Sequence, residues 1–186
     1  IITSIVFFLL ILFSFFFYQD YETRNKEKLA NRYFSTIIEF KTGNKLQTVD
    51  SMKEIIKYRD KTYSPLAFYY LLDNDLINSK QEINEYFDII INETDLDDEN
   101  KNLTIFKKGL FNSEFANENE ILGILNPLIK SESVWKPHAL YLMAEYYFAK
   151  KEKQKAKEFF EQLIILENIS EKIRIEAQKR LRSDFS

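Results

Sequence analysis

The chain has 186 residues and a formal net charge of -3, and it contains no cysteine. The lack of cysteine excludes disulfides, thiol catalysis and thiolate metal sites, and the charge gives no basic footprint for nucleic acid. Apolar residues make up 45% and charged residues 30%, which is typical of a folded protein. Only three Gly and three Pro favour long helices over a turn-rich sandwich or barrel.

The first eighteen residues, IITSIVFFLLILFSFFFY, carry no charge. As a helix they would be about 27 Å long, close to the hydrocarbon thickness of a bilayer. A buried core helix would normally show a polar face, and a cleaved signal peptide would need a small-residue cleavage site that FFFYQDYETR does not offer. Tyr18 and Tyr21 fall where interfacial aromatic residues belong. The sequence therefore predicts a retained transmembrane anchor at residues 1–18.

The flank that follows, residues 19–28, mixes acidic and basic residues and does not decide the orientation. We expect it to be a juxtamembrane linker that leads into the first helix of the folded domain. A single anchor before a large domain favours a cytoplasmic N-terminus and an exported domain. The chain begins at Ile1 rather than Met, so we also expect a longer natural N-terminus.

From about residue 24 onward every segment has the pattern of a helix, and none alternates with period two, so we expect an all-α fold without a sheet. Pro65 lies in a first turn, where a missing N–H is tolerated. Ser79 with Glu82 forms a capping-box pattern, and Ser170 is a second serine cap. The predicted helices cover residues 28–40, 45–58, 64–75, 79–91, 101–111, 117–129, two segments within 139–160 that meet at the charged corner 150–154, and 170–185.

Helix pairs of this length are typical of helical repeat proteins, so we searched the sequence for repeats. The 34-residue tetratricopeptide pattern, with small residues at places 8 and 20 and aromatic residues at places 11 and 24, fits the last pair well. These places hold Ala144, Ala156, Tyr147 and Phe160, while an earlier and weaker unit has Gly109 at place 8. Successive units are offset by 34, 38 and 35 residues. We predict that the small residues lie at the tight crossing of each helix hairpin, because bulk there would separate the helices.

This register predicts a right-handed α-solenoid of about four degenerate tetratricopeptide-like hairpins at residues 29–186, with the last helix as a cap. Place 5 of the four units is aromatic each time, in Phe34, Phe68, Phe106 and Tyr141. Two interpretations stay open for these side chains. They pack between helices, or they form a partly exposed ladder in the concave groove that binds an apolar or extended peptide.

Residues suited to catalysis are scarce. His138 is the only histidine and lies at the start of a predicted helix, where a capping or surface role is expected. The acidic run DLDDEN, residues 95–100, lacks the central Gly and distal Glu of an EF-hand loop, so we interpret it as a solvated connection. We expect no enzyme activity, no catalytic residues, no cofactor and no metal.

The chain resembles the bacterial YfgM-like family of ancillary SecYEG translocon subunits. The resemblance rests on the single N-terminal apolar segment, the degenerate repeats and the element W-x-x-x-A-L-x-L-x-A, here Trp135, Ala139, Leu140, Leu142 and Ala144, preceded by LNPLI at 125–129. It covers almost the whole chain. It implies a single-pass inner-membrane protein with a periplasmic interaction domain, whose partners are translocon subunits, periplasmic chaperones or exported chains.

Two functions follow as hypotheses. The first is an anchored adaptor that binds partner proteins at the translocon. The second is a structural envelope component of cell division or membrane-complex assembly that acts by self-association, and the sequence does not separate the two.

Overall fold

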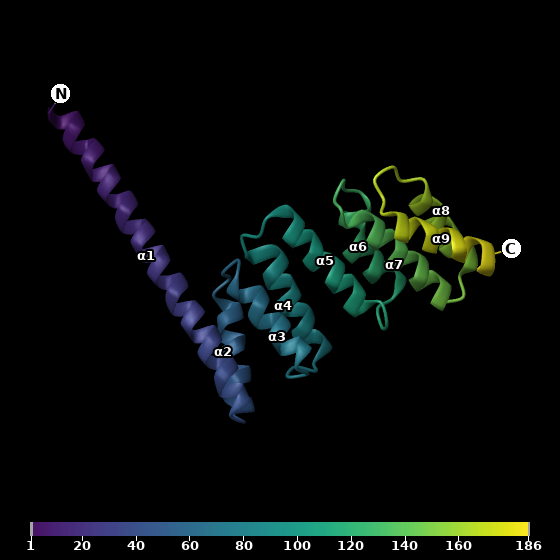
Figure 1. Cartoon of the computed structure of the whole chain (residues 1–186), viewed down its shortest axis with the longest axis horizontal. Coiled ribbons are helices and arrows are strands. Elements are labelled where there is room, and N and C mark those ends of the chain that lie inside the picture. Colours follow the sequence, from purple (N-terminus) through teal and green to yellow (C-terminus); the bar gives the residue numbers. More distant parts are fainter. Residues whose placement is uncertain (1, 186) are drawn as a thin grey trace. The chain divides into compact units, whose positions relative to one another are not determined.

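In the computed structural model, which describes the backbone of residues 2–185 and the side chains of residues 7 and 10–185, every regular element is a helix and no strand occurs (Figure 1). The expectation of an all-α fold is confirmed for this part of the chain. The helices are α1 (Ile2–Lys41), α2 (Lys45–Lys57), α3 (Tyr63–Asp73), α4 (Lys80–Glu93), α5 (Asp98–Asn112), α6 (Glu118–Ile129), α7 (Lys136–Ala149), α8 (Lys153–Ile164) and α9 (Glu171–Asp184).

The chain divides into two compact units. Unit 1 comprises Ile1–Ile89 and Glu93–Asp95, and unit 2 comprises Ile90–Asn92 and Leu96–Ser186. Helices α1 to α3 and most of α4 belong to unit 1, and α5 to α9 belong to unit 2. The predicted repeat domain at residues 29–186 is therefore shared between the two units. Within each unit, consecutive helices pair as hairpins, which is a helical-repeat-like arrangement.

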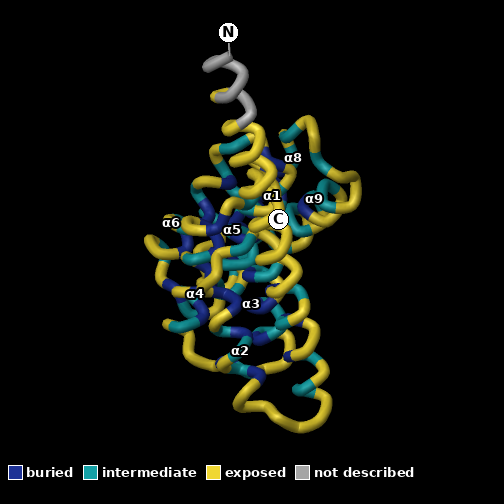
Figure 2. Tube along the Cα trace, turned by 90° about the vertical axis from the view of Figure 1, so that its left-hand side faces the viewer, coloured by how far each residue is buried: buried dark blue, intermediate teal, exposed yellow. Residues whose placement is uncertain are grey.

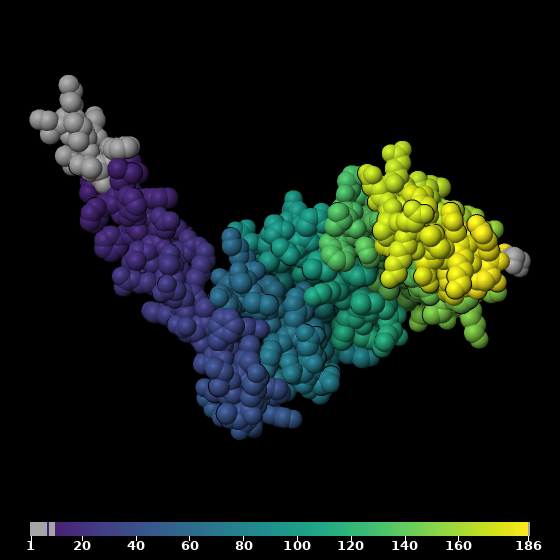
Figure 3. Space-filling model, viewed as in Figure 1, coloured from purple at the N-terminus to yellow at the C-terminus, as the bar shows by residue number. Residues whose placement is uncertain are grey.

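Helix α1 runs without a break through residues 19–28, the predicted linker. This stretch contains neither Gly nor Pro, and two ion pairs one turn apart support it: Arg24 with Asp20 at 3.0 Å and Lys26 with Glu22 at 2.8 Å. On the face that Figure 3 shows, the described N-terminal part of α1 has no other part of unit 1 against it. The mixed charges of the flank thus stabilise a helix.

The core of unit 1 lies where α1, α2 and α3 meet (Figure 2). Leu29, Tyr33 and Thr36 of α1 are buried, and Met52 and Ile55 of α2 are fully buried. On the side of α4, the Phe68 ring lies 4.7 Å from the ring of Phe87, edge to face. Helix α3 is therefore enclosed by its neighbours on both sides.

Unit 2 is built around the hairpin of α7 and α8. Ala144, Ala156 and Phe160 are fully buried, and Tyr147 is nearly so. The two alanines lie in separate core clusters, and each shares its cluster with the aromatic residue of the other helix: Ala156 with Tyr147, and Ala144 with Phe160. Each small side chain therefore leaves room for a large ring across the crossing.

Gly109 marks the closest approach of α5 and α6. A Cβ atom added at Gly109 would lie 2.3 Å from Cδ2 of Leu125, which is far inside van der Waals contact. Leu125 is fully buried, so it has little space into which it could move. The small residue expected at place 8 is thus required by the packing of this hairpin.

Several helix ends follow the expected capping chemistry. Ser79 accepts a hydrogen bond from the N–H of Glu82 at 3.3 Å, and Ser170 accepts one from Ile173 at 3.4 Å. The reciprocal capping box forms elsewhere, between Asn117 and Glu120. At Ser79 it is incomplete, because the Glu82 carboxylate pairs instead with the ammonium group of Lys53 on α2.

Three turns place residues other than Gly in the left-handed conformation: Arg59, Asp75 and Lys151. At the corner between α7 and α8, the N–H of Glu152 bonds to the carbonyl of Tyr147 at 2.9 Å, and the N–H of Lys151 bonds to that of Phe148 at 3.0 Å. This is a Schellman motif, which usually has Gly at the left-handed position. The charged corner therefore ends α7 sharply although it contains no Gly.

Within the described part of the chain, no helix contains a stretch long and apolar enough to cross a membrane. The predicted anchor at residues 1–18 includes residue 1 and the side chains of residues 2–6, 8 and 9, which lie outside the described residues. The anchor therefore stays a prediction.

Candidate functional site

The four aromatic residues at place 5 have different environments. Phe34 is 57% exposed, whereas Phe68 is 0% exposed and packs against Tyr86 and Phe87 of α4. Of the two interpretations left open, Phe68 therefore fits packing between helices and not a partly exposed ladder. The reason is that α4 covers the face of α3 that carries this ring.

Phe106 and Tyr141 lie in unit 2 and are half-buried. The Phe106 ring stacks on Trp135 with a centroid distance of 5.5 Å. Tyr141 contacts Phe160 at 5.6 Å, and burial raises the pKa of its phenol above the usual value. Both rings thus contribute to the packing of unit 2, which leaves Phe34 as the member of the ladder with most of its surface free.

An exposed apolar surface of unit 1 lies on α1. Phe15, Phe16 and Phe17 are 60%, 64% and 69% exposed. Further exposed side chains on the same stretch of helix are Phe7, Leu10, Ile11, Leu12, Phe13, Tyr18 and Tyr21. Monomeric soluble proteins rarely expose a continuous apolar surface of this kind, which marks a site of contact with a membrane or a partner.

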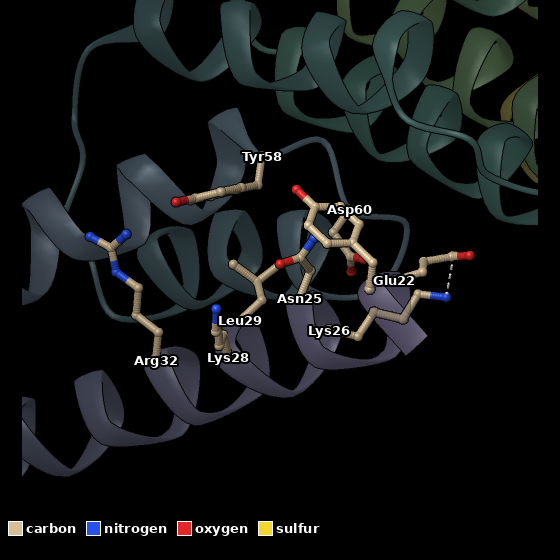
Figure 4. Close-up of a pocket in the computed structure, with 9 residues that line it drawn as sticks. Glu22, Asn25, Lys26, Lys28, Leu29, Arg32, Tyr58 and Asp60 are labelled. Atoms are coloured by element: carbon tan, nitrogen blue, oxygen red, sulfur yellow. Dashed lines mark ion pairs between the residues drawn. The ribbon is translucent and has the colours of Figure 1, made fainter. Parts of the chain in front are cut away.

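A cleft of about 480 Å³ lies in unit 1, directly after this apolar surface (Figure 4). Its lining residues on α1 recur every three or four positions, which places them on one face of the helix. Leu29, at the base of this face, is buried. The lining comprises Tyr21, Glu22, Asn25, Lys26, Lys28, Leu29 and Arg32 from α1, and Tyr58 and Asp60 from the connection between α2 and α3.

The connection between α2 and α3 holds the other side of the cleft in place. Arg59 adopts a left-handed conformation, and its neighbours Tyr58 and Asp60 lie across the cleft from α1 (Figure 4). Oδ1 of Asp60 accepts hydrogen bonds from the N–H groups of Thr62 at 2.9 Å and Tyr63 at 2.7 Å. The carboxylate is therefore fixed by the start of α3.

The charged groups of the cleft are mostly paired. Lys26 binds Glu22 at 2.8 Å, and this hydrogen bond holds the pKa of Glu22 below its usual value and raises that of Lys26. Arg32 binds Glu54 of α2 and lowers the pKa of that carboxyl group. Lys28 is exposed and has no ion-pair partner among the described residues. Apart from these pairs, the cleft presents one cation, Lys28, and one carboxylate, Asp60, without an ion-pair partner among the described residues.

Unit 2 contains a charged cluster that sequence reasoning missed. Glu118 accepts hydrogen bonds from the Tyr147 hydroxyl at 2.8 Å and from the ammonium group of Lys155 at 2.8 and 2.9 Å. Lys155 also pairs with Glu152 at 2.7 Å. These contacts lower the pKa of Glu118, and burial together with the Glu118 bond raises that of Tyr147 to about 12. The cluster ties α6 to α7 and α8, and only the tertiary fold brings its members together.

Two sequence interpretations need correction. His138 is half-buried and not a surface residue, and the acidic run 95–100 is only in part a connection, because α5 begins at Asp98. The His138 ring lies 5.2 Å from Trp135 and 5.7 Å from Phe106, within an aromatic cluster. Asp97 caps the start of α5 by accepting a hydrogen bond from the N–H of Asn100 at 2.9 Å, which lowers its pKa. Glu99 accepts one from the hydroxyl of Ser133 at 3.0 Å. In the part of the chain that the structure describes, no group of three His, Asp or Glu side chains is suited to hold a metal ion.

In comparisons with known proteins, no family model, no curated protein and no solved structure matches this chain.

Proposed function

We propose that the chain is a membrane-anchored adaptor whose helical hairpins bind partner proteins, with α1 as both the anchor and the first helix of the folded part. The observation that carries this proposal is the exposed apolar surface of α1. Phe15, Phe16 and Phe17 are consecutive and all exposed. Because successive residues of a helix point about 100° apart, three in a row face different directions.

An apolar surface that extends around a helix favours a bilayer as its environment. A docking helix for one protein groove needs only an apolar stripe, while a helix that is apolar all round is either buried in a core or inserted in a membrane. Tyr18 and Tyr21, both exposed, then lie at the interface with water. The charged pairs from Asp20 onward begin outside the hydrocarbon.

The rest of the chain supports a binding role because its packing resembles that of repeat proteins. Gly109, Ala144 and Ala156 allow close helix crossings, and hairpins of this kind stack into extended binding surfaces. The proposed array is the right-handed solenoid of about four hairpins. Phe34 and Ile38, one turn apart on α1, are exposed apolar side chains suited to contact a partner.

The resemblance to YfgM-like proteins supplies the proposed setting. The anchor would lie in the inner membrane with the folded part in the periplasm. The partners would be translocon subunits, periplasmic chaperones or exported chains.

The test is crosslinking in cells, with a photoreactive residue at Phe34 or Ile38. Asp50, an exposed polar residue of α2, is the matched control position in the same unit. We expect crosslinks to translocon subunits or exported chains from positions 34 and 38 and few from position 50. Crosslinks only to a second copy of the chain would contradict the adaptor and favour the self-associating scaffold. Equal crosslinking from all three positions would contradict a specific binding surface.

A further inference from the structure

We propose that the cleft beside α1 binds the phosphodiester of a phospholipid headgroup, with Lys28 as its main cationic contact. The inference rests on the proposed anchor, because a lipid reaches the cleft only if α1 enters the bilayer. The proposal assigns a ligand to the cleft, which has no role in the proposed adaptor function. The occupant we infer is a lipid of the same leaflet as the folded part.

The position of the cleft along α1 is the first argument. Its lining on α1 begins at Tyr21 and ends at Arg32, which follow the predicted anchor at 1–18 by about 5 to 21 Å at 1.5 Å per residue. Side chains of a helix tilt toward its N-terminus, so the long and exposed side chain of Lys28 is able to extend toward the bilayer. Its ammonium group thereby approaches the headgroup level, as snorkelling lysines do.

The state of the charges is the second argument. Of the cations in the lining, Lys26 and Arg32 have carboxylate partners, while Lys28 has none among the described residues. Asp60 is the nearby anion on the side of the cleft opposite α1. It accepts hydrogen bonds from two backbone N–H groups, and these partly compensate its negative charge. A phosphodiester carries one negative charge and suits one free ammonium group.

The third argument is the shape and the remaining lining. A volume of about 480 Å³ lies within the range of small-molecule sites. The hydroxyl of Tyr58 and the amide of Asn25 are hydrogen-bond donors at the wall, and Figure 4 shows both residues beside the cleft. Leu29 offers an apolar base. A headgroup with its glycerol backbone matches this combination of an ammonium group, neutral donors and an apolar floor.

The experiment measures lipid retention by the full chain in detergent, using native mass spectrometry after removal of bound lipid. The probes are phosphatidylglycerol, diacylglycerol with the same acyl chains, and soluble glycerol phosphate. We expect phosphatidylglycerol to bind more tightly than either of the other two. Since a basic residue near an anionic lipid surface contributes about 1 kcal/mol, Lys28→Gln should weaken phosphatidylglycerol binding about fivefold, and Lys28→Arg should retain it.

Lys172→Gln, which removes an exposed lysine from α9 of unit 2, is the control and should leave lipid binding unchanged. Equal phosphatidylglycerol binding by Lys28→Gln and Lys172→Gln would overturn the proposal. Binding of diacylglycerol as tight as that of phosphatidylglycerol would also overturn it, because the phosphate would then be irrelevant. Tight binding of glycerol phosphate would indicate a soluble ligand and overturn the lipid assignment.

These variants keep residues 1–18, so the proposed anchor is tested separately. If the full chain fails to stay in membranes, the anchor is wrong whatever the lipid binding in detergent. If the chain stays in membranes and Lys28→Gln binds lipid normally, only the cleft proposal fails.

Discussion

Two aromatic-rich stretches of the molecule have opposite environments. The described rings of α1 between residues 7 and 21 are exposed, while Tyr147 and Phe160 of the α7–α8 hairpin are buried. Both stretches combine Phe and Tyr at high density. The difference is the presence of small residues and of a facing helix. Ala144 and Ala156 make room for the rings where α7 packs on α8, whereas the described side chains of α1 before residue 21 are exposed. Aromatic content alone therefore does not predict a core.

The largest loss of stability is expected when the buried ring of Phe68 is removed, and the exposed ring of Phe34 in the same unit provides the comparison. Phe68→Ala should lower the free energy of unfolding by about 3–5 kcal/mol, because it leaves a cavity between α3 and α4. Phe34→Ala, on the exposed face of α1, should cost less than about 1 kcal/mol. Urea unfolding of the two variants measures both values. Similar losses would show that Phe34 is also part of the core.

The next effect concerns the small residues at the crossings. Ala144→Leu or Ala156→Leu should cost about 1–3 kcal/mol, because added methyl groups overpack a filled core. Ala149→Leu is the control, since Ala149 is exposed at the end of α7, and it should be nearly neutral. Melting temperatures of the three variants decide the outcome. Equal shifts at all three positions would contradict the repeat register.

The two helical glycines provide a matched pair for the same comparison. Gly109→Ala brings a Cβ atom against Leu125 and should destabilise unit 2 by about 1–3 kcal/mol. A Cβ atom at Gly123 of α6 meets nothing within 4 Å, so Gly123→Ala should stabilise by about 0.5–1 kcal/mol through helix propensity. Chemical denaturation of both variants gives the sign of each change, and a Gly109→Ala variant as stable as the wild type or more stable would contradict the close approach of α5 and α6.

A smaller effect is the pH dependence of the α7–α8 hairpin, in which the hydroxyl of the buried Tyr147 ring donates a hydrogen bond to Glu118. The Lys155 and Tyr147 contacts lower the pKa of Glu118 from 4.5 in the folded state. A lowered carboxyl pKa means that the stabilisation is present above about pH 4.5 and is lost as the pH falls through the folded-state value.

Glu118→Gln removes this titration. The wild type should therefore lose more stability than Glu118→Gln when the pH is lowered from 6 to about 3, as measured by melting temperature. Parallel pH profiles for the two proteins would show that the cluster contributes nothing to the hairpin.

The sequence predicted the helices and their packing residues better than the exposed surface. Period and caps located the helices after residue 44 to within a few residues, and the buried positions of Ala144, Ala156 and Gly109 followed from the repeat spacing. These features are local or recur at a fixed interval.

The rest depends on long-range contacts that spacing does not encode. Phe68 has the same place in its unit as Phe34, and only the packing of α4 against α3 distinguishes the two. The cleft was missed because Tyr58 and Asp60 approach α1 through the turn at Arg59. One signal was available: Lys28 and Arg32 lie one turn apart, and therefore on the same face, of the helix that follows the predicted anchor.

The most direct test of the account is the membrane behaviour of the chain with and without residues 1–18. Alkaline carbonate extraction of cell membranes should leave the full chain in the membrane pellet. Residues 19–186 expressed alone should be released into the supernatant, remain helical and unfold cooperatively. Release of the full chain by carbonate, or an insoluble and unfolded product without residues 1–18, would contradict the anchored adaptor.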